Sequence, residues 1–164
     1  MVNPGSSTNK KFIVSVGSAT GNNYLHSFLF VTGDGGGQAK IQTGFYGEDL
    51  IYDWTYNSNW NHIAFTFDNS TKEGILYLNG SNVTSKIFAQ GLSGSGRATV
   101  GTPTWNLGHE VFLGNIDEVR IWNVVRSSSD ILSNYNNYSL NAGTSGLRAY
   151  YKFDQGNPRN SNAG

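Results

Sequence analysis

The sequence predicts an all-β protein, folded as a two-sheet antiparallel β-sandwich with one short helix near residues 127–136. Three observations support this fold class. Apolar and polar residues alternate with a period of two over many short segments, as in strands with one buried face. Polar turns separate these segments roughly every eight to twelve residues, which is typical of β-sandwiches. The composition agrees, because 21 of the 164 residues are glycine and only 13% are charged.

The first predicted strands lie before residue 60. In Lys11–Gly17 the alternate apolar residues share one face, as the period of a strand requires. Leu25–Thr32 is more continuously apolar, which is expected for a strand covered on both sides. The run Gly33–Gly37 predicts a turn, since glycine adopts positive φ without steric cost. Two further strands are predicted before residue 60: Ala39–Thr43 and Asp49–Tyr56.

The segment Trp60–Gly80 has the pattern of a β-hairpin. Ile63, Phe65 and Phe67 share one face of its first strand, and the polar run Asp68–Gly74 forms the loop. The second strand ends in an Asn-Gly pair, a dipeptide that favours chain reversal because both residues tolerate left-handed geometry. Shorter strands are predicted after this hairpin: Val83–Ala89 and Ala98–Gly101.

A short helix is predicted from Ser127 onwards. Ser127 can cap it, and Asp130 at the third position completes a box-like arrangement. Three residues are expected to form its buried stripe: Ile131, Leu132 and Tyr135. Trp60 and Trp122 are assigned to the space between the sheets, because large aromatic side chains fill sandwich cores well.

Several motifs occur in a fixed order along the chain. Trp60–Ala64 followed by Leu76–Gly80 resembles the tryptophan-led hairpin of laminin G-like jelly-roll domains. Gly114–Trp122 resembles that family's G-x-I-D-E-V-R-I-[YW] strand, and Arg126–Ile131 resembles its helix opening with Ser. Gly146–Asp154 is similar to the closing strand. In this order the motifs are specific to the concanavalin A-like lectin/glucanase superfamily, with pentraxins as relatives, and the resemblance implies a jelly roll.

The resemblance sets the expected domain limits. It covers residues 11–156, so residues 1–10 are interpreted as a linker or tag and residues 157–164 as a linker or the start of a following segment. Family members usually begin with a strand of the F-[TS]-[IL]-x-x-W type, which is not found before Lys11. Two explanations stay open: the chain is cut from a larger protein or assembly, or a neighbour supplies the edge strand.

Composition excludes several classes of partner. Lys+Arg and Asp+Glu number 11 each, so no net field attracts the chain to nucleic acid or to an anionic membrane. No apolar run nears the length that crosses a bilayer, so no membrane insertion is expected. The absence of cysteine excludes disulfides, thiolate metal sites and a cysteine nucleophile. The polar but weakly charged composition favours an extracellular, cell-surface or virion-surface location.

Catalytic carboxylates are not evident. A hydrolase of this superfamily needs two carboxylates close together on one strand, in a pattern such as E-x-D-x-x-E. Asp117 and Glu118 are adjacent, so in a strand their side chains would point to opposite faces, and the pair Glu48-Asp49 fails for the same reason. The sequence therefore predicts no enzyme activity.

The family resemblance also raises the question of a bound calcium ion. The segments that align with the double calcium site of pentraxins carry no acidic cluster. A calcium ion is coordinated by roughly six to eight oxygen atoms, several of them from carboxylates. Many jelly-roll relatives bind one structural calcium ion, and Asp117 or Asp154 is the candidate ligand for it here. The alternative is that Asp117 only makes hydrogen bonds or pairs with Arg120 or Arg148.

Aromatic residues supply the candidate binding surface. Tyr52, Trp54 and Tyr56 are spaced by two, so all three project from one face of their strand. Exposed, such a row would stack on the apolar faces of sugar rings, with Tyr46 and Trp105 extending the platform. The alternative is that Tyr52 and Trp54 form core between the sheets.

These observations predict a non-catalytic recognition module, a lectin-like or adhesive domain that binds carbohydrate or a surface protein. The alternatives are a structural or assembly module of a virion or surface layer, with a neighbour completing an unpaired strand edge, and an accessory domain of a larger glycan-active enzyme.

Overall fold

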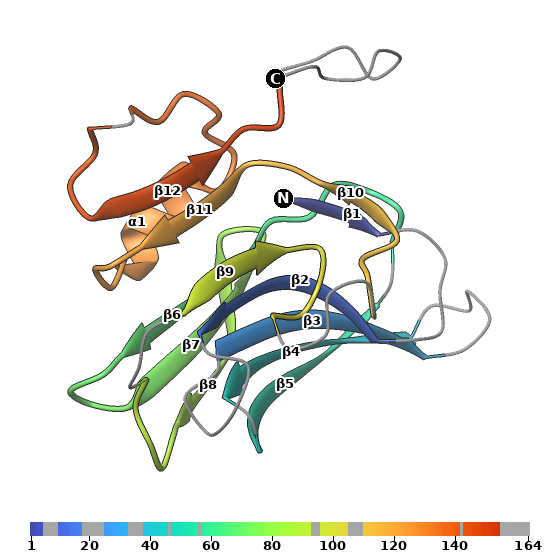
Figure 1. Ribbon diagram of the computed structural model, residues 1–164, viewed down its shortest axis with the longest axis horizontal. Coiled ribbons are helices and arrows are strands. Elements are labelled where there is room, and N and C mark those ends of the chain that lie inside the picture. Colours follow the sequence, from blue (N-terminus) through green and yellow to red (C-terminus); the bar gives the residue numbers. More distant parts are fainter. Residues whose placement is uncertain are drawn as a thin grey trace.

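The computed structural model describes residues 1–4, 10–17, 25–32, 38–45, 47–55, 57–92, 96–104, 110–141 and 143–154. The described residues form an all-β sandwich with one helix, which confirms the predicted fold class (Figure 1). All pairings of adjacent strands within it are antiparallel. No described helix is long and apolar enough to span a membrane.

The first layer is a five-stranded sheet with the order β5-β4-β3-β2-β9. Its inner face follows from the alternation along β4, where Ala39, Ile41 and Phe45 are at most 3% exposed. The strands of this layer are β2 (Lys10–Gly17), β3 (Leu25–Thr32), β4 (Gln38–Phe45), β5 (Glu48–Thr55) and β9 (Arg97–Val100).

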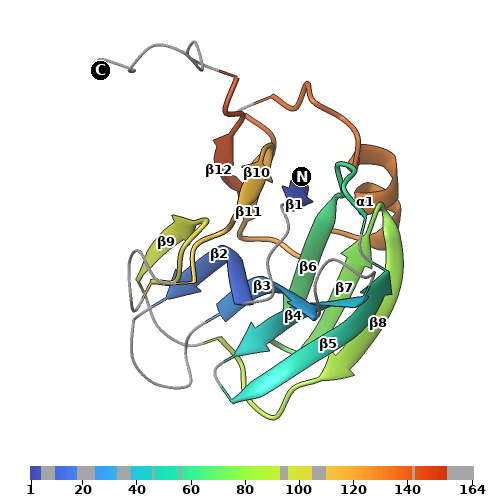
Figure 2. The same cartoon turned by 90° about the vertical axis from the view of Figure 1, so that its right-hand side faces the viewer.

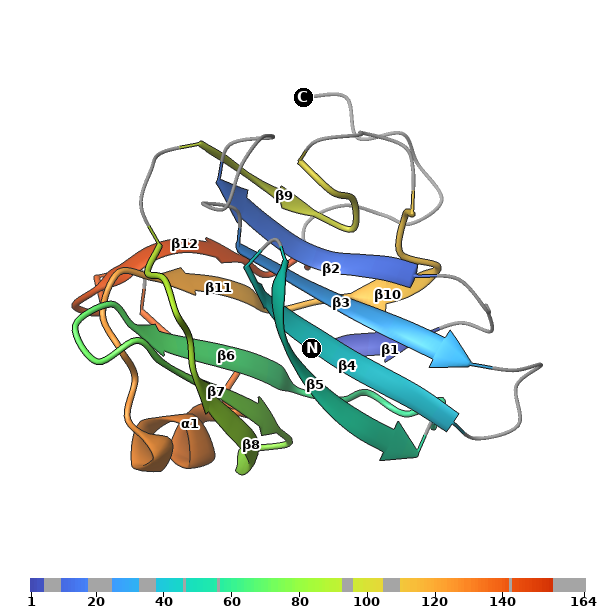
Figure 3. The ribbon, with the colours of Figure 1, turned by 90° about the horizontal axis from the view of Figure 1, so that it is seen from below.

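The second layer is divided into parts, as Figures 2 and 3 show. A three-stranded sheet has the order β6-β7-β8, β11 pairs with β12, and β1 pairs with β10. The strands of this layer are β1 (Val2–Pro4), β6 (Ile63–Asp68), β7 (Glu73–Leu78), β8 (Ser81–Ile87), β10 (Gly114–Ile116), β11 (Val119–Trp122) and β12 (Leu147–Tyr151).

Phenylalanines close one end of the core. Phe88, which is 1% exposed, packs edge-to-face against Phe45 and Phe67, with ring centroids 5.3 and 5.7 Å away. Phe45 also packs edge-to-face on Phe67 at 4.8 Å. Such edge-to-face contacts between rings of the two layers stabilise the sandwich beyond the apolar area that they bury.

The helix α1 (Ser128–Asn134) begins as predicted. The side chain of Ser127 accepts a hydrogen bond from the Asp130 amide, and the Asp130 side chain accepts one from the Ser127 amide. Ser128 Oγ lies 3.0 Å from the hydroxyl of Tyr77, which attaches the helix to β7. The expected buried stripe is wrong, because no residue of α1 is fully buried and Leu132 is 56% exposed.

Two other sequence-based assignments are wrong. Residues 1–10 are not simply a linker or tag, because Val2 is 2% exposed in the core and β1 pairs with β10. Trp60 is not a core residue, since it is 44% exposed and β6 starts three positions later, at Ile63. Trp122 is half-buried, with the Arg126 guanidinium 4.5 Å from its ring centroid.

Candidate functional site

The aromatic residues of β5 point into the sandwich. Trp54 is 7% exposed, and Tyr52 packs against the core cluster. The register explains this, because Trp54 lies opposite Ala39 and Tyr52 lies opposite Ile41, and both of these β4 residues are buried. Directly opposed residues of an antiparallel pair share one face, so the core face of β4 determines the core face of β5.

The predicted exposed platform on β5 is therefore wrong. Trp54 belongs to the core, and the outward face of β5 carries Ile51, Asp53 and Thr55. Three of the predicted platform residues lie outside the described residues: Tyr46, Tyr56 and Trp105. The sequence held a signal for the true orientation, because apolar residues alternate through β4 and a short hairpin loop fixes the register.

The two candidate calcium ligands make different local contacts. Asp117 Oδ1 accepts a hydrogen bond from the Glu118 amide at 2.8 Å, and Asp154 is exposed. Over the described ranges, no group of three or more His, Asp or Glu side chains is placed to hold a metal ion.

Glu118 has a structural role. It adopts φ of 54° between β10 and β11, so the predicted continuous strand is interrupted there. Its carboxylate pairs with Arg120 at 2.7 Å, and both side chains are at most 10% exposed. The hydroxyl of Tyr150 also donates to Glu118. Burial raises the pKa of Tyr150, and this hydrogen bond adds to the shift.

The Arg120 guanidinium connects this carboxylate to the end of α1. It donates to the carbonyl oxygens of Asn134, at 3.1 Å, and Asn137. It also lies 5.1 Å from the centroid of the Tyr150 ring. The motif that resembles the family strand therefore encodes a buried ion pair that anchors the helix. The sequence left Arg120 and Arg148 as alternative partners of Asp117; in the structure Arg120 pairs with Glu118, and Asp117 accepts a hydrogen bond from the Glu118 amide.

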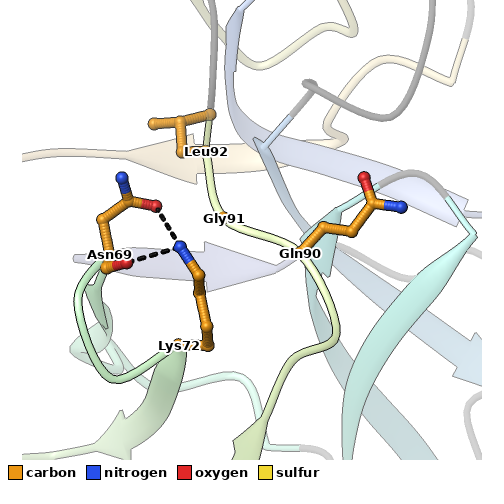
Figure 4. A pocket seen from close by; sticks show the side chains of 5 residues that line it. All are labelled: Asn69, Lys72, Gln90, Gly91 and Leu92. Carbon is orange, nitrogen blue, oxygen red and sulfur yellow. Dashed lines mark hydrogen bonds between the residues drawn. The ribbon is translucent and has the colours of Figure 1, made fainter.

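A shallow polar pocket lies where the β6–β7 turn meets the segment after β8 (Figure 4). It encloses about 320 Å³ and is lined by Asn69, Lys72, Gln90, Gly91 and Leu92. Lys72 Nζ donates to the carbonyl oxygen of Asn69 at 2.5 Å and to its Oδ1 at 3.4 Å. Figure 4 shows this pair on one side of the Gly91 backbone and Gln90 on the other.

Because Gly91 has no side chain, the side chains of Asn69 and Lys72 can approach its backbone closely. A Cβ atom at Gly91 would lie 1.9 Å from Asn69 Oδ1 and 2.5 Å from Lys72 Nζ, distances that real contacts do not reach. Sequence reasoning missed this pocket, since its residues come from two turns that are joined only in the folded chain.

A pair of exposed rings lies at the end of β12. Tyr151 and Phe153 are 48% and 55% exposed, and their rings stack with centroids 6.1 Å apart and an interplanar angle of 21°. Exposed flat rings of this kind are suited to contact with the apolar face of a sugar. The sequence motif was matched to the closing strand, but its exposed rings were not recognised as a surface.

A larger cavity, of about 450 Å³, lies between β6 and β11 and reaches the inner face of β2. Met1, His62 and Arg120 are among its polar lining residues. Burial lowers the pKa of the Met1 amine to about 6, and the charge of Arg120 contributes to this shift. Burial also lowers the pKa of His62 to about 4, with the Met1 amine and Arg120 as further causes.

Comparison with known proteins now assigns the family. The family model described as the concanavalin A-like lectin/glucanases superfamily matches residues 2–132. The chain belongs to this superfamily. Membership confirms the resemblance that the sequence motifs indicated, and the match includes Val2 of β1.

One solved structure agrees with this chain at the level of the fold. A protein from Bacteroides ovatus ATCC 8483, provisionally described as carbohydrate-binding, superposes with a TM-score of 0.63 at 18% identity, over 94% of this chain and 46% of that one. The chain thus spans less than half of that protein. An S-layer domain-containing protein from Clostridium thermocellum ATCC 27405 matches with a TM-score of 0.39 at 21% identity, over 79% and 64% of the two chains. No curated protein matches the chain.

Proposed function

We propose that this concanavalin A-like domain is a non-catalytic module that recognises carbohydrate at a cell or virion surface. The observation that carries the proposal is the pocket of Figure 4, which presents amide and ammonium groups at a hollow on the surface. Side-chain amides offer both donors and acceptors, which is what recognition of sugar hydroxyls needs. The fold shared with the Bacteroides ovatus protein supports a carbohydrate ligand in general terms.

The arrangement of carboxylates supports a binding role. Glu118 is paired with Arg120 and hydrogen-bonded to Tyr150, so it is committed to the fold. The Glu48 carboxylate accepts a hydrogen bond from the Ala89 amide at 2.9 Å and forms an ion pair with Lys86 at 3.4 Å. A glycosidase needs two carboxylates on either side of a substrate, and these two are engaged elsewhere. A structural calcium ion at Asp117 or Asp154 stays a prediction, which calcium titration of chelator-treated protein would test.

The test uses affinity electrophoresis and a glycan array with matched amide variants. Gln90→Ala removes a pocket amide, and Asn82→Ala removes an exposed amide on β8 as the control. Wild type and Asn82→Ala should bind the same polysaccharide, whereas Gln90→Ala should bind about tenfold more weakly if one hydrogen bond is lost.

Two results would count against this site. Absence of any glycan ligand would reject the function itself. If Gln90→Ala binds as well as wild type and Tyr151→Ala does not bind, the glycan site would instead be the ring pair of Tyr151 and Phe153.

A second candidate function is assembly, with a neighbour supplying an edge strand. The observation that favours it is the division of the second layer, where β6 and β11 each pair on one side within the described residues. Unpaired edges invite another strand. Self-association measured by light scattering would test this role, and a strict monomer at high concentration would contradict it.

A further inference from the structure

Of the five described residues that line the pocket of Figure 4, Lys72 alone carries a charge. The other lining residues are Asn69, Gln90, Gly91 and Leu92. Within the described ranges, no carboxylate lies within ion-pair distance of Lys72 Nζ. The hollow therefore presents a positive charge that the described part of the fold does not neutralise.

The acidic residues on either side of Lys72 do not reach its ammonium group. Asp68 Oδ1 accepts hydrogen bonds from the Ser70 amide at 2.8 Å and from Ser70 Oγ at 2.6 Å. The Ser70 hydroxyl is the largest cause that lowers the pKa of Asp68, and the charge of Lys72 is the smallest. Glu73 begins β7 and lies opposite Asp68 in the strand register. Neither carboxylate forms an ion pair with Lys72, so the ammonium is left for a ligand.

The backbone at Lys72 is fixed by a contact with the core. Its φ is 62°, in the left-handed region, which is uncommon for a residue with a Cβ atom. The Lys72 carbonyl accepts a hydrogen bond from the Phe88 amide at 2.9 Å, and Phe88 is 1% exposed. Such a conformation persists only where the surrounding structure determines it. The start of the lysine side chain is therefore positioned by the core as well as by the turn.

Asn69 and Gly91 set the position of the ammonium group itself. Lys72 Nζ donates to the carbonyl oxygen and to Oδ1 of Asn69, and an ammonium group carries three N–H donors. A Cβ atom at Gly91 would lie 2.5 Å from Nζ, so the missing side chain leaves room for the nitrogen. Figure 4 shows Nζ between Asn69 and the Gly91 backbone. One donor is thus left for a ligand in the hollow.

The rest of the lining suits a sugar ring. Gln90 has a side-chain amide, which can both donate to and accept from hydroxyl groups. Leu92 packs, partly buried, against the core cluster and offers an apolar contact. An acidic sugar combines the three matching features: hydroxyl groups, an apolar C–H face and an anion.

We propose that the carbohydrate bound in this pocket is acidic, and that a carboxylate or sulfate group on the sugar meets Lys72 Nζ. This rests on the carbohydrate-binding function proposed above and adds the chemical class of the ligand. A lysine ammonium is a compact charge that attracts either anion, and hydrogen bonds to charged groups are stronger than neutral ones. Because Lys+Arg and Asp+Glu number 11 each, the attraction comes from this local charge and not from the whole chain.

Affinity electrophoresis of the full chain measures the preference with polymers in matched acidic and neutral forms. Polygalacturonate, alginate and hyaluronate are each compared with the same polymer after reduction of its carboxyl groups, and dextran sulfate is compared with dextran. At least one acidic form should bind about three- to tenfold more tightly than its neutral partner, as one charged contact predicts. Added salt should reduce this difference, because it screens partly exposed charges.

Two lysine variants then locate the charge. Lys72→Met keeps the aliphatic stem and removes the ammonium, so the preference for the acidic form should be lost. Lys40→Met is the matched control, because it removes the same charge from β4 in the other layer, where Lys40 pairs with Asp53. That variant should keep the wild-type preference. A merely structural role of Lys72 in its turn would weaken acidic and neutral forms equally. The matched polymers and the salt series on wild type keep the test valid if Lys72→Met does not fold.

The outcomes separate this inference from the proposed function. Equal binding of every acidic polymer and its neutral partner overturns the acidic ligand, and carbohydrate recognition stands if Gln90→Ala still weakens the binding. Absence of binding to any polymer rejects both. An acidic preference that survives in Lys72→Met overturns the role of this ammonium group. A preference for dextran sulfate alone supports the proposal with a sulfate as the anion, and a preference for the polyuronates alone supports it with a carboxylate.

Discussion

Ala39 of β4 and Trp54 of β5 lie directly opposite each other, and both side chains are buried, at 2% and 7% exposure. This pairing means that the indole fills the space between the layers. A change at Trp54 must therefore act first on stability, and on any ligand only through the fold.

Replacing Trp54 with alanine should destabilise the protein by about 3–5 kcal/mol, since a large buried aromatic side chain leaves a cavity when removed. The matched control is Ile51→Ala on the outward face of the same strand, where the side chain is 48% exposed and a cost of about 0.5 kcal/mol or less is expected. Urea denaturation of both variants measures this. A larger cost for Ile51→Ala than for Trp54→Ala would show that β5 is turned the other way.

The sequence was informative where a signal is local. The capping box at Ser127 and Asp130 and the hairpin from Ile63 to Leu78 need only neighbouring residues, and both are present. The facing of Trp54 could not be decided from β5 alone, because a period of two defines two faces and does not say which is inside. That choice comes from the partner strand.

Sites built from segments that are distant in the sequence could not be predicted from local patterns. The pocket at Asn69 and Gln90 joins two turns, and the cavity at Met1 and His62 depends on how the parts of the second layer lie relative to each other. The role of Glu118 was hidden for a different reason. A positive φ at a non-glycine residue breaks the strand periodicity that sequence reasoning assumed.

The buried ion pair of Glu118 and Arg120 gives a second prediction. Glu118→Gln should destabilise the protein by about 3 kcal/mol or more, because the Arg120 guanidinium, at 10% side-chain exposure, would be left without its counter-charge. The double variant Glu118→Gln with Arg120→Met should recover part of the loss, since no unpaired charge then remains. A double-mutant cycle from urea denaturation measures the coupling, and strictly additive costs would contradict it.

Glycine substitutions give a third prediction, about packing inside β7. A Cβ atom at Gly74 would lie 2.5 Å from Phe88 Cε2 and 2.9 Å from the ring of Phe65, so Gly74→Ala should cost about 1–3 kcal/mol. The control is Gly143→Ala, where nothing lies within 4 Å of the added atom. That variant should keep wild-type stability in thermal unfolding. A stabilised Gly74→Ala protein would mean that the phenylalanine cluster is looser than described.

The dependence of stability on pH gives a fourth prediction. The folded chain holds the pKa of His62 at about 4, below its ordinary value of 6.5, because burial and the nearby Met1 and Arg120 charges disfavour the imidazolium. The unfolded chain therefore binds more protons between these values, and stability must fall as pH falls from 6.5 towards 4. The two values correspond to a loss of about 3 kcal/mol. Urea denaturation at a series of pH values measures this loss.

His62→Gln is the matched control for this prediction, because it keeps a polar side chain and removes the titrating ring. Its stability should be flatter between pH 6.5 and 4 than that of wild type. The Met1 amine, whose pKa falls from 8.0 to about 6, adds a separate loss of stability as pH falls from 8 to 6. That loss should persist in His62→Gln and disappear on acetylation of the amine. Parallel pH profiles for wild type and His62→Gln would show that the ring is not buried beside Met1.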